Sequence, residues 1–186
     1  DLFMLGAVFS FAVLTELLGA QRPSGTNYAL LLVVLLLTMA FGAIVNVTIE
    51  RLAYRRLRTA PKLAPLITAI GMSFVLQWIG LKWIGSNPVN VNTVLPATSF
   101  EISGVIINFK TLVIFAITIP LLIVLTFIVN KTRRGRAMRA TAQDKDASRL
   151  MGIDVNKTIT FTFAIAGAAA GAAGIMWAQT TGTVAY

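Results

Sequence analysis

Four stretches of this chain carry no charged residue, and each is about as long as one membrane-crossing helix. They contain 27 residues after Arg22, 19 after Lys62, 20 after Lys110 and 29 after Lys157. A helix that crosses the hydrocarbon core of a bilayer needs about 20 predominantly apolar residues. Each stretch therefore holds one span and none comfortably holds two.

The composition agrees with this reading. Of the 186 residues, 56% are hydrophobic and only 12% are charged, whereas about 25% of an ordinary soluble domain is charged. A soluble domain would have to bury four long, charge-free helices. The sequence thus predicts an all-α, polytopic transmembrane helix bundle forming a single domain over 1–186. About five spans are expected, at 1–18, 28–48, 63–81, 111–129 and 158–179.

The sequence predicts a local structure for two of the segments that connect the spans, 19–27 and 85–110. Residues 19–27 read as a short turn, because Arg22, Pro23 and Gly25 interrupt the apolar pattern. In 85–110 the pattern changes to period two, and Ser103-Gly104 suits a two-residue hairpin turn. We therefore expect a small extracytoplasmic β-hairpin in this segment.

The positive charges are distributed unevenly between the two sides of the bundle. Of 16 Lys and Arg residues, five lie in 51–62 and eight in 131–157, and only Arg22, Lys82 and Lys110 lie on the other side. The positive-inside rule makes 50–62 and 130–157 cytoplasmic loops and 85–110 a periplasmic loop. The net charge of +9 then needs no nucleic acid. Three arginines on one helical face contact anionic lipid headgroups in the simplest reading: Arg51, Arg55 and Arg58.

Several kinds of chemistry are excluded by the residues that the chain lacks. It contains no cysteine and no histidine, so zinc sites of the Cys/His type, thiolates and imidazole bases are absent. Without paired carboxylates, a membrane enzyme is disfavoured. No charge sits near the middle of a span, which argues against an ion-coupled secondary transporter. We expect no catalytic residue, no metal and no cofactor.

The last span is rich in small residues. Gly167 and Gly171 form a G-x-x-x-G pattern, which Gly174 continues. In lipid, small residues let helix backbones approach closely. The pattern is typical of plain helix packing, and it also suits a helix at the centre of a bundle or beside a pathway.

Few polar residues lie inside the spans, and no carboxylate lies near the middle of any of them. Uncharged polar groups either hydrogen-bond between helices, which is commoner, or line a hydrated route. On the second reading, the candidates for a translocation path are Asn46, Thr68, Ser73 and Gln77.

The 130–157 loop contains a run of helix-forming residues. The pattern predicts one short helix over 136–151 that ends at Gly152 as a C′ cap. Asp154 would cap the next helix. One face of the loop helix is small and mildly apolar, and it either docks into a groove on a cytoplasmic partner or lies on the membrane. This face consists of Ala137, Ala140, Ala147 and Met151.

The segment 135–174 resembles the permease subunits of branched-chain amino acid ABC importers (the LivH-like group). The similarity continues upstream in 50–58 and 63–77, and 1–7 resembles the end of a further signature of that family, so it covers essentially the whole chain. Compared with the family, the chain is expected to be an internal fragment that lacks both ends. The loop positions that carry the match are Gly135, Arg136, Ala137, Arg139, Ala140, Asp144, Ala147, Leu150, Gly152 and Ile153.

The resemblance implies a function for the chain and for its loop. It implies a multi-pass permease subunit of the bacterial inner membrane that catalyses no reaction. Its partners would be a second permease subunit (the same or a different one), two cytoplasmic ATPases and a periplasmic solute-binding protein. Movement of the ATPases, delivered through 136–152, would drive alternating access. The absence of a G-x-x-x-x-G-K-[ST] phosphate loop agrees with this.

The substrate is less strongly implied than the family. Relatives on the same scaffold transport urea, short amides or other amino acids, so these are alternatives to branched-chain amino acids. An unrelated channel or secondary transporter and a structural membrane scaffold are the other classes that the residues leave open.

Overall fold

The computed structural model describes residues 2–18, 28–57, 60–61, 63–85, 89–90, 99–102 and 105–184. Its contacts divide the chain into two compact units. The first contains Asp1–Ala97 and Ala164–Tyr186, and the second contains Thr98–Phe163. The predicted turn at 19–27, the dipeptide Ser103-Gly104 and Arg58 lie outside the described residues.

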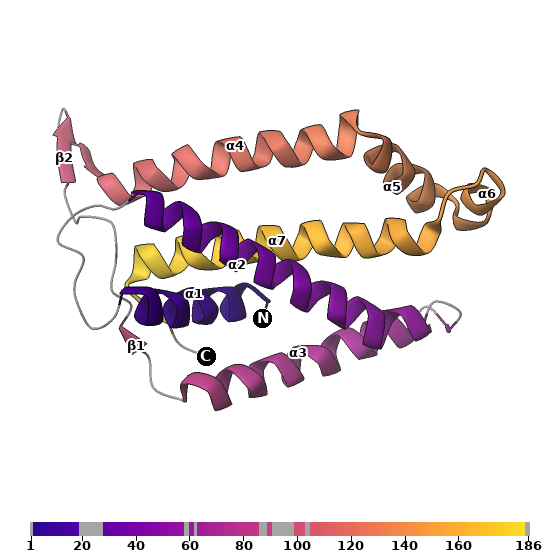
Figure 1. Ribbon diagram of the computed structural model, residues 1–186, viewed down its shortest axis with the longest axis horizontal. Coiled ribbons are helices and arrows are strands. Elements are labelled where there is room, and N and C mark those ends of the chain that lie inside the picture. The colour runs from indigo at the N-terminus through magenta and orange to yellow at the C-terminus, as the bar shows by residue number, and fades with distance from the viewer. Residues whose placement is uncertain are drawn as a thin grey trace. The chain divides into compact units, whose positions relative to one another are not determined.

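Long apolar helices dominate the fold (Figure 1). Four helices of the described residues are long and apolar enough to cross a membrane. They are α2 (Tyr28–Ile49), α3 (Leu63–Ile84), α4 (Phe109–Lys131) and α7 (Val155–Thr181). The helix α1 (Leu2–Leu18) is apolar but has only 17 residues. The predicted all-α, polytopic architecture is therefore confirmed, while a fifth span at α1 stays a prediction.

In the first unit, α1 and α2 lie beside the C-terminal half of α7 (Figure 1). Phe9 of α1 stacks on Phe41 of α2, with ring centroids 4.1 Å apart. The helix α3 joins this unit through Leu76, which packs in one apolar cluster with Leu5 and Ile49. The paired strands β1 (Val89–Asn90) and β4 (Thr183–Val184) belong to the same unit.

The chain after α2 is helical where the sequence predicts a basic loop. A π-helix over Glu50–Tyr54 and a 3-10 helix over Arg55–Leu57 continue directly from α2. The backbone N–H of Arg55 donates to the Glu50 carbonyl, so the main chain stays hydrogen-bonded although the side chains become charged. Glu50 itself is 0% exposed. The polar segment predicted from residue 50 therefore continues the helix as far as Leu57, and the cytoplasmic location of 50–62 stays a prediction.

The second unit begins with two short strands. β2 (Ser99–Ile102) pairs antiparallel with β3 (Val105–Asn108). Asn108 is also the N-cap of α4, so β3 leads into that helix without a connecting loop. The position of these strands relative to a membrane stays a prediction. α4 contains Pro120 and has no buried residue within the structure described.

Candidate functional site

The glycines of α7 lie where two other helices of the first unit approach its backbone. A Cβ atom at Gly167 would overlap the carbonyl of Gly42 in α2, and one at Gly171 would overlap the carbonyl of Thr38. A Cβ atom at Gly174 would overlap the carbonyl of Phe3 in α1. The small residues therefore permit close contact of α7 with both α1 and α2.

The four polar residues suggested for a translocation path lie in two helices of the first unit. Asn46 is buried in α2, and its Cβ atom faces Gly167 of α7. Thr68, Ser73 and Gln77 are half-buried in α3. The Thr68 hydroxyl donates to the Ala64 carbonyl of its own helix, at 2.9 Å. Asn46 is thus placed at a helix–helix contact, and a role in transport stays a prediction for all four.

The loop between α4 and α7 contains two helices instead of the single one predicted over 136–151. These are α5 (Arg133–Gln143) and α6 (Lys145–Leu150), and Asp144 between them is extended, with φ −149° and ψ 116°. The predicted continuous small face is therefore wrong. Its α5 alanines are half-buried, whereas the α6 alanine is exposed.

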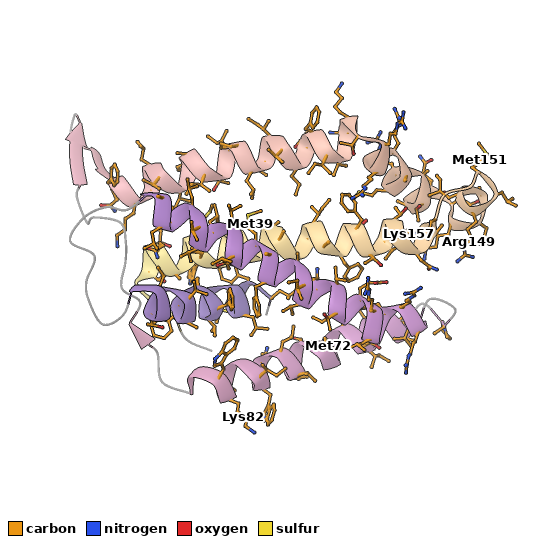
Figure 2. All side chains as sticks on the ribbon, in the orientation of Figure 1. Met39, Met72, Lys82, Arg149, Met151 and Lys157 are labelled. Carbon is orange, nitrogen blue, oxygen red and sulfur yellow. The ribbon has the colours of Figure 1, made fainter. Side chains whose placement is uncertain are left out.

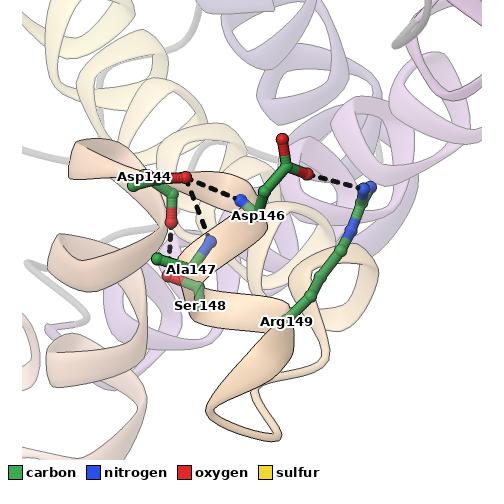
Figure 3. Close-up of polar contacts among 5 residues, drawn as sticks. All are labelled: Asp144, Asp146, Ala147, Ser148 and Arg149. Carbon is green, nitrogen blue, oxygen red and sulfur yellow. Dashed lines mark hydrogen bonds and ion pairs between the residues drawn. The ribbon is translucent and has the colours of Figure 1, made fainter.

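Asp144 interrupts the helix because its side chain replaces a backbone acceptor (Figure 3). Its Oδ1 accepts hydrogen bonds from the N–H groups of Asp146 at 2.8 Å and Ala147 at 3.1 Å. The Ser148 hydroxyl donates to the Asp144 carbonyl at 2.7 Å. The N–H of Ala147, and next that of Asp146, lowers the pKa of the Asp144 carboxyl below its ordinary value of 3.8. Asp144 is therefore the N-cap of α6.

The end of α6 is closed by Gly152, as the sequence predicts. Gly152 has φ +80°, a left-handed conformation that favours glycine. Its N–H donates to the Arg149 carbonyl and the N–H of Ile153 donates to the Ser148 carbonyl, both at 3.0 Å. This pair of bonds is a Schellman motif. The six residues of α6 are thus capped at both ends.

The predicted capping role of Asp154 is confirmed at the start of α7. Its Oδ1 accepts from the N–H of Lys157 at 3.0 Å, and its Oδ2 lies 3.2 Å from the Lys157 ammonium. The N–H and the ammonium of Lys157 lower the pKa of this carboxyl below 3.8. The loop therefore has fixed geometry where it enters the last long helix.

The loop is also attached to the end of α4, where Thr132 bonds to both helices. The Thr132 hydroxyl donates to the Ile128 carbonyl at 2.5 Å and accepts from the N–H of Gly135 at 3.0 Å. A Cβ atom at Gly135 would overlap the carbonyls of Ile128 and Val129. Only glycine allows α5 to start this close to the last turn of α4.

The outer end of the loop exposes two large apolar side chains. Leu150 is 89% exposed and Met151 is 82% exposed. Figure 2 shows Met151 beyond the end of α6, pointing away from the rest of the loop. Unlike the exposed apolar residues of the long helices, these two belong to a polar segment that is too short and too charged to span a bilayer. Exposed apolar side chains surrounded by polar residues mark candidate protein–protein or membrane contacts.

The structure separates the predicted loop residues into two groups. Gly135 and Arg139 face α4: the Arg139 guanidinium donates to the carbonyls of Val129 and, at 3.5 Å, Asn130. Leu150 belongs to the exposed tip. Thr132 is a further residue of the contact with α4, and a Thr after the last apolar turn is a typical N-cap that the sequence pattern offers.

Comparison with known proteins identifies the family. Residues 1–186 match the family model described as "Branched-chain amino acid transport system / permease component". The chain is 33% identical to the high-affinity branched-chain amino acid transport system permease protein BraD of Pseudomonas aeruginosa, over 99% of the chain and 61% of BraD. It is 30% identical to the corresponding permease protein LivH of Salmonella typhimurium, over 99% of the chain and 60% of LivH.

A shorter match points to the same group. The chain is 43% identical to a probable branched-chain amino acid transport permease protein LivH of Methanocaldococcus jannaschii, over 31% of the chain and 18% of that protein. No solved structure matches. The chain spans about three-fifths of the length of BraD and of the Salmonella LivH. Because the family model covers every residue, this chain belongs to the family of branched-chain amino acid transport system permease components.

Proposed function

We propose that the chain acts as part of the membrane permease subunit of an ABC importer for branched-chain or related amino acids. The relatives' names support the substrate class. In this proposal the permease carries out no reaction itself. It forms the route through the membrane, and ATPase subunits in the cytoplasm drive its alternating access.

The proposed assembly contains more than this subunit. A second permease subunit, the ATPases and a periplasmic solute-binding protein complete it. The family and the apolar helices make the protein a multi-pass protein of the inner membrane. We propose α1 as a fifth span, with 50–62 and 130–157 in the cytoplasm and 85–110, including the β2–β3 hairpin, in the periplasm. The solute route would pass Asn46, Thr68, Ser73 and Gln77.

The observation that supports an ATPase contact is the apolar tip of the loop, formed by Leu150 and Met151. A position inside the bilayer does not explain its exposure, because the tip lies between the capping aspartates Asp144 and Asp154 and close to several cations. Capping at both ends holds α6 in one conformation before it meets a partner, which reduces the entropy that binding costs. We therefore propose that Leu150 and Met151 enter a groove on the ATPase subunit, with α6 as their support.

Replacing Leu150 tests this contact. In the intact importer, Leu150→Asp should weaken association of the ATPase subunit about 30-fold, because losing a central apolar contact costs about 2 kcal/mol. Co-purification and the Kd of the isolated ATPase for the permease in lipid nanodiscs measure this.

Gln143→Asp is the matched control, because it adds the same charge to an exposed position of the same loop. It should leave the Kd unchanged. Equal Kd values for wild type and Leu150→Asp would contradict the proposed contact. An ATPase that does not bind the wild-type permease would contradict the proposed function as a whole.

A further inference from the structure

At the carboxyl end of α4, two backbone carbonyls accept hydrogen bonds from a side chain of the following loop. The last carbonyls of a helix have no intrahelical partner, and they form the negative end of the helix dipole. In α4, which ends at Lys131, the carbonyls of Val129 and Asn130 belong to this group. Arg139, two turns into α5, donates through its guanidinium to both.

Arginine suits this position better than any other side chain. Its planar fork presents several fixed N–H donors and remains charged at all physiological pH values. A positive charge is also favoured at a helix carboxyl terminus. The contact is made possible by Gly135, one turn earlier in α5, which has no Cβ atom to separate the two helices. Thr132, Gly135 and Arg139 thus form three successive attachments of α5 to α4, and we call them the α4–α5 clamp.

The clamp lies at the opposite end of the loop from the apolar tip. From the tip, α6 is joined to α5 through Asp144, whose N–H donates to the Ala140 carbonyl and whose side chain caps α6. Every connection from Met151 back to α4 is therefore hydrogen-bonded. Between α6 and α4 there is no unstructured segment that could absorb a displacement of α6. Such a displacement should therefore reach α4.

We propose that Arg139 is a positioning residue that fixes α5 to the end of α4 and so transmits displacement of the loop into this membrane helix. The inference rests on the proposed function for the source of the displacement. It assigns Arg139 a role inside the permease, whereas its place in the family motif suggests a contact with the ATPase. Arg139 is then required for coupling and dispensable for binding of the ATPase.

The geometric part of the proposal is tested without the ATPase. None of the 186 residues is cysteine. After any cysteine elsewhere in the permease has been replaced by serine, spin labels can be attached to cysteines replacing Lys131, at the end of α4, and Gln143, at the end of α5. In the intact permease in nanodiscs, wild-type Arg139 should give one narrow distance distribution. Arg139→Ala should broaden it, and Arg139→Lys, which keeps the charge but loses the fork, should give an intermediate width.

Transport per ATP tests the functional part. In proteoliposomes with the ATPases, the periplasmic binding protein and radiolabelled leucine, Arg139→Ala should lower the leucine transported per ATP hydrolysed by about tenfold, the scale expected for losing a charged hydrogen bond. The Kd for the ATPase should not change. Arg133→Ala removes the same charge from an exposed position of α5 and should leave the distances and the coupling ratio as in wild type.

Two results would overturn the proposal. If Arg139→Ala leaves the distance distribution and the coupling ratio unchanged, no clamp exists. If Arg139→Ala weakens ATPase binding as Leu150→Asp does, Arg139 is itself part of the ATPase contact. A wild-type permease that binds no ATPase would overturn the proposed function, and the distance measurement would still decide whether Arg139 holds α5 to α4.

Discussion

Asp144 decides the shape of the cytoplasmic loop at the scale of a single residue. Its neighbours on both sides are helix formers, and the pattern of the segment predicts one helix. Its carboxylate, however, offers the N–H groups of Asp146 and Ala147 an acceptor that a continuous helix would supply from the backbone. The N-cap therefore turns one helix into two and places the apolar tip on the shorter one.

The cap gives α6 a dependence on pH whose sign follows from the lowered pKa of Asp144. Because the folded-state pKa lies below the ordinary 3.8, the ionised cap stabilises α6 above that pH, and the stabilisation is lost as the pH falls through the folded-state pKa. Hydrogen-exchange protection of the Ala147 and Ser148 amides in the intact permease should fall over this range. Asp144→Asn, which caps without titrating, should remove the dependence, and Asp144→Ala should give low protection at every pH. An unchanged pH profile in Asp144→Asn would refute the assignment.

Close packing of α7 against α1 and α2 is the main feature at the scale of the elements. The G-x-x-x-G pattern in the sequence indicates a smooth helix face but does not identify the partner helices. The structure places Gly167 against Gly42 and Gly171 against both Thr38 and Gly6. One glycine pattern in α7 therefore serves contacts with two helices.

Adding a single methyl group at Gly167 should separate α7 from α2. Since a Cβ atom there would overlap the Gly42 carbonyl and the Asn46 side chain, Gly167→Ala should destabilise the intact permease by about 2 kcal/mol, as overpacking typically does. Denaturant titration of the detergent-solubilised protein measures this. Gly71→Ala, at a position where a Cβ atom meets open space, should cost nothing. Equal midpoints for the two variants would show that the α2–α7 contact is not tight.

At the scale of the whole molecule, the charge asymmetry predicts how the helices are oriented in the membrane. Thirteen of the 16 Lys and Arg residues lie in 51–62 and 131–157. Positive residues near short loops stay in the cytoplasm because translocating them is unfavourable. The apolar tip formed by Leu150 and Met151 should thus face the compartment that contains ATP.

Cysteine labelling tests this orientation directly. A cysteine replacing Lys82, at the end of α3, should react with a membrane-impermeant maleimide added to intact spheroplasts, whereas one replacing Arg149 should react only after the membrane is permeabilised. Both side chains lie at exposed positions, so accessibility within the protein does not distinguish them. The reverse pattern would contradict the proposed topology and, with it, the ATPase contact.

The sequence by itself determined where the long helices lie and that they form a polytopic bundle. The predicted span 63–81 begins where α3 begins, and 111–129 lies within α4. It also located the caps at Gly152 and Asp154. These features depend on the hydrophobicity and residue type of a short stretch, which are independent of where the rest of the chain goes.

Only the tertiary structure decided which distant groups meet. It buried Glu50 and directed Arg139 to the carbonyls of α4. Each of these outcomes depends on competition between alternative hydrogen-bond partners or on close approach of distant backbones. The residue pattern of one segment does not reveal such contacts, because the groups that meet are brought together only when the helices pack.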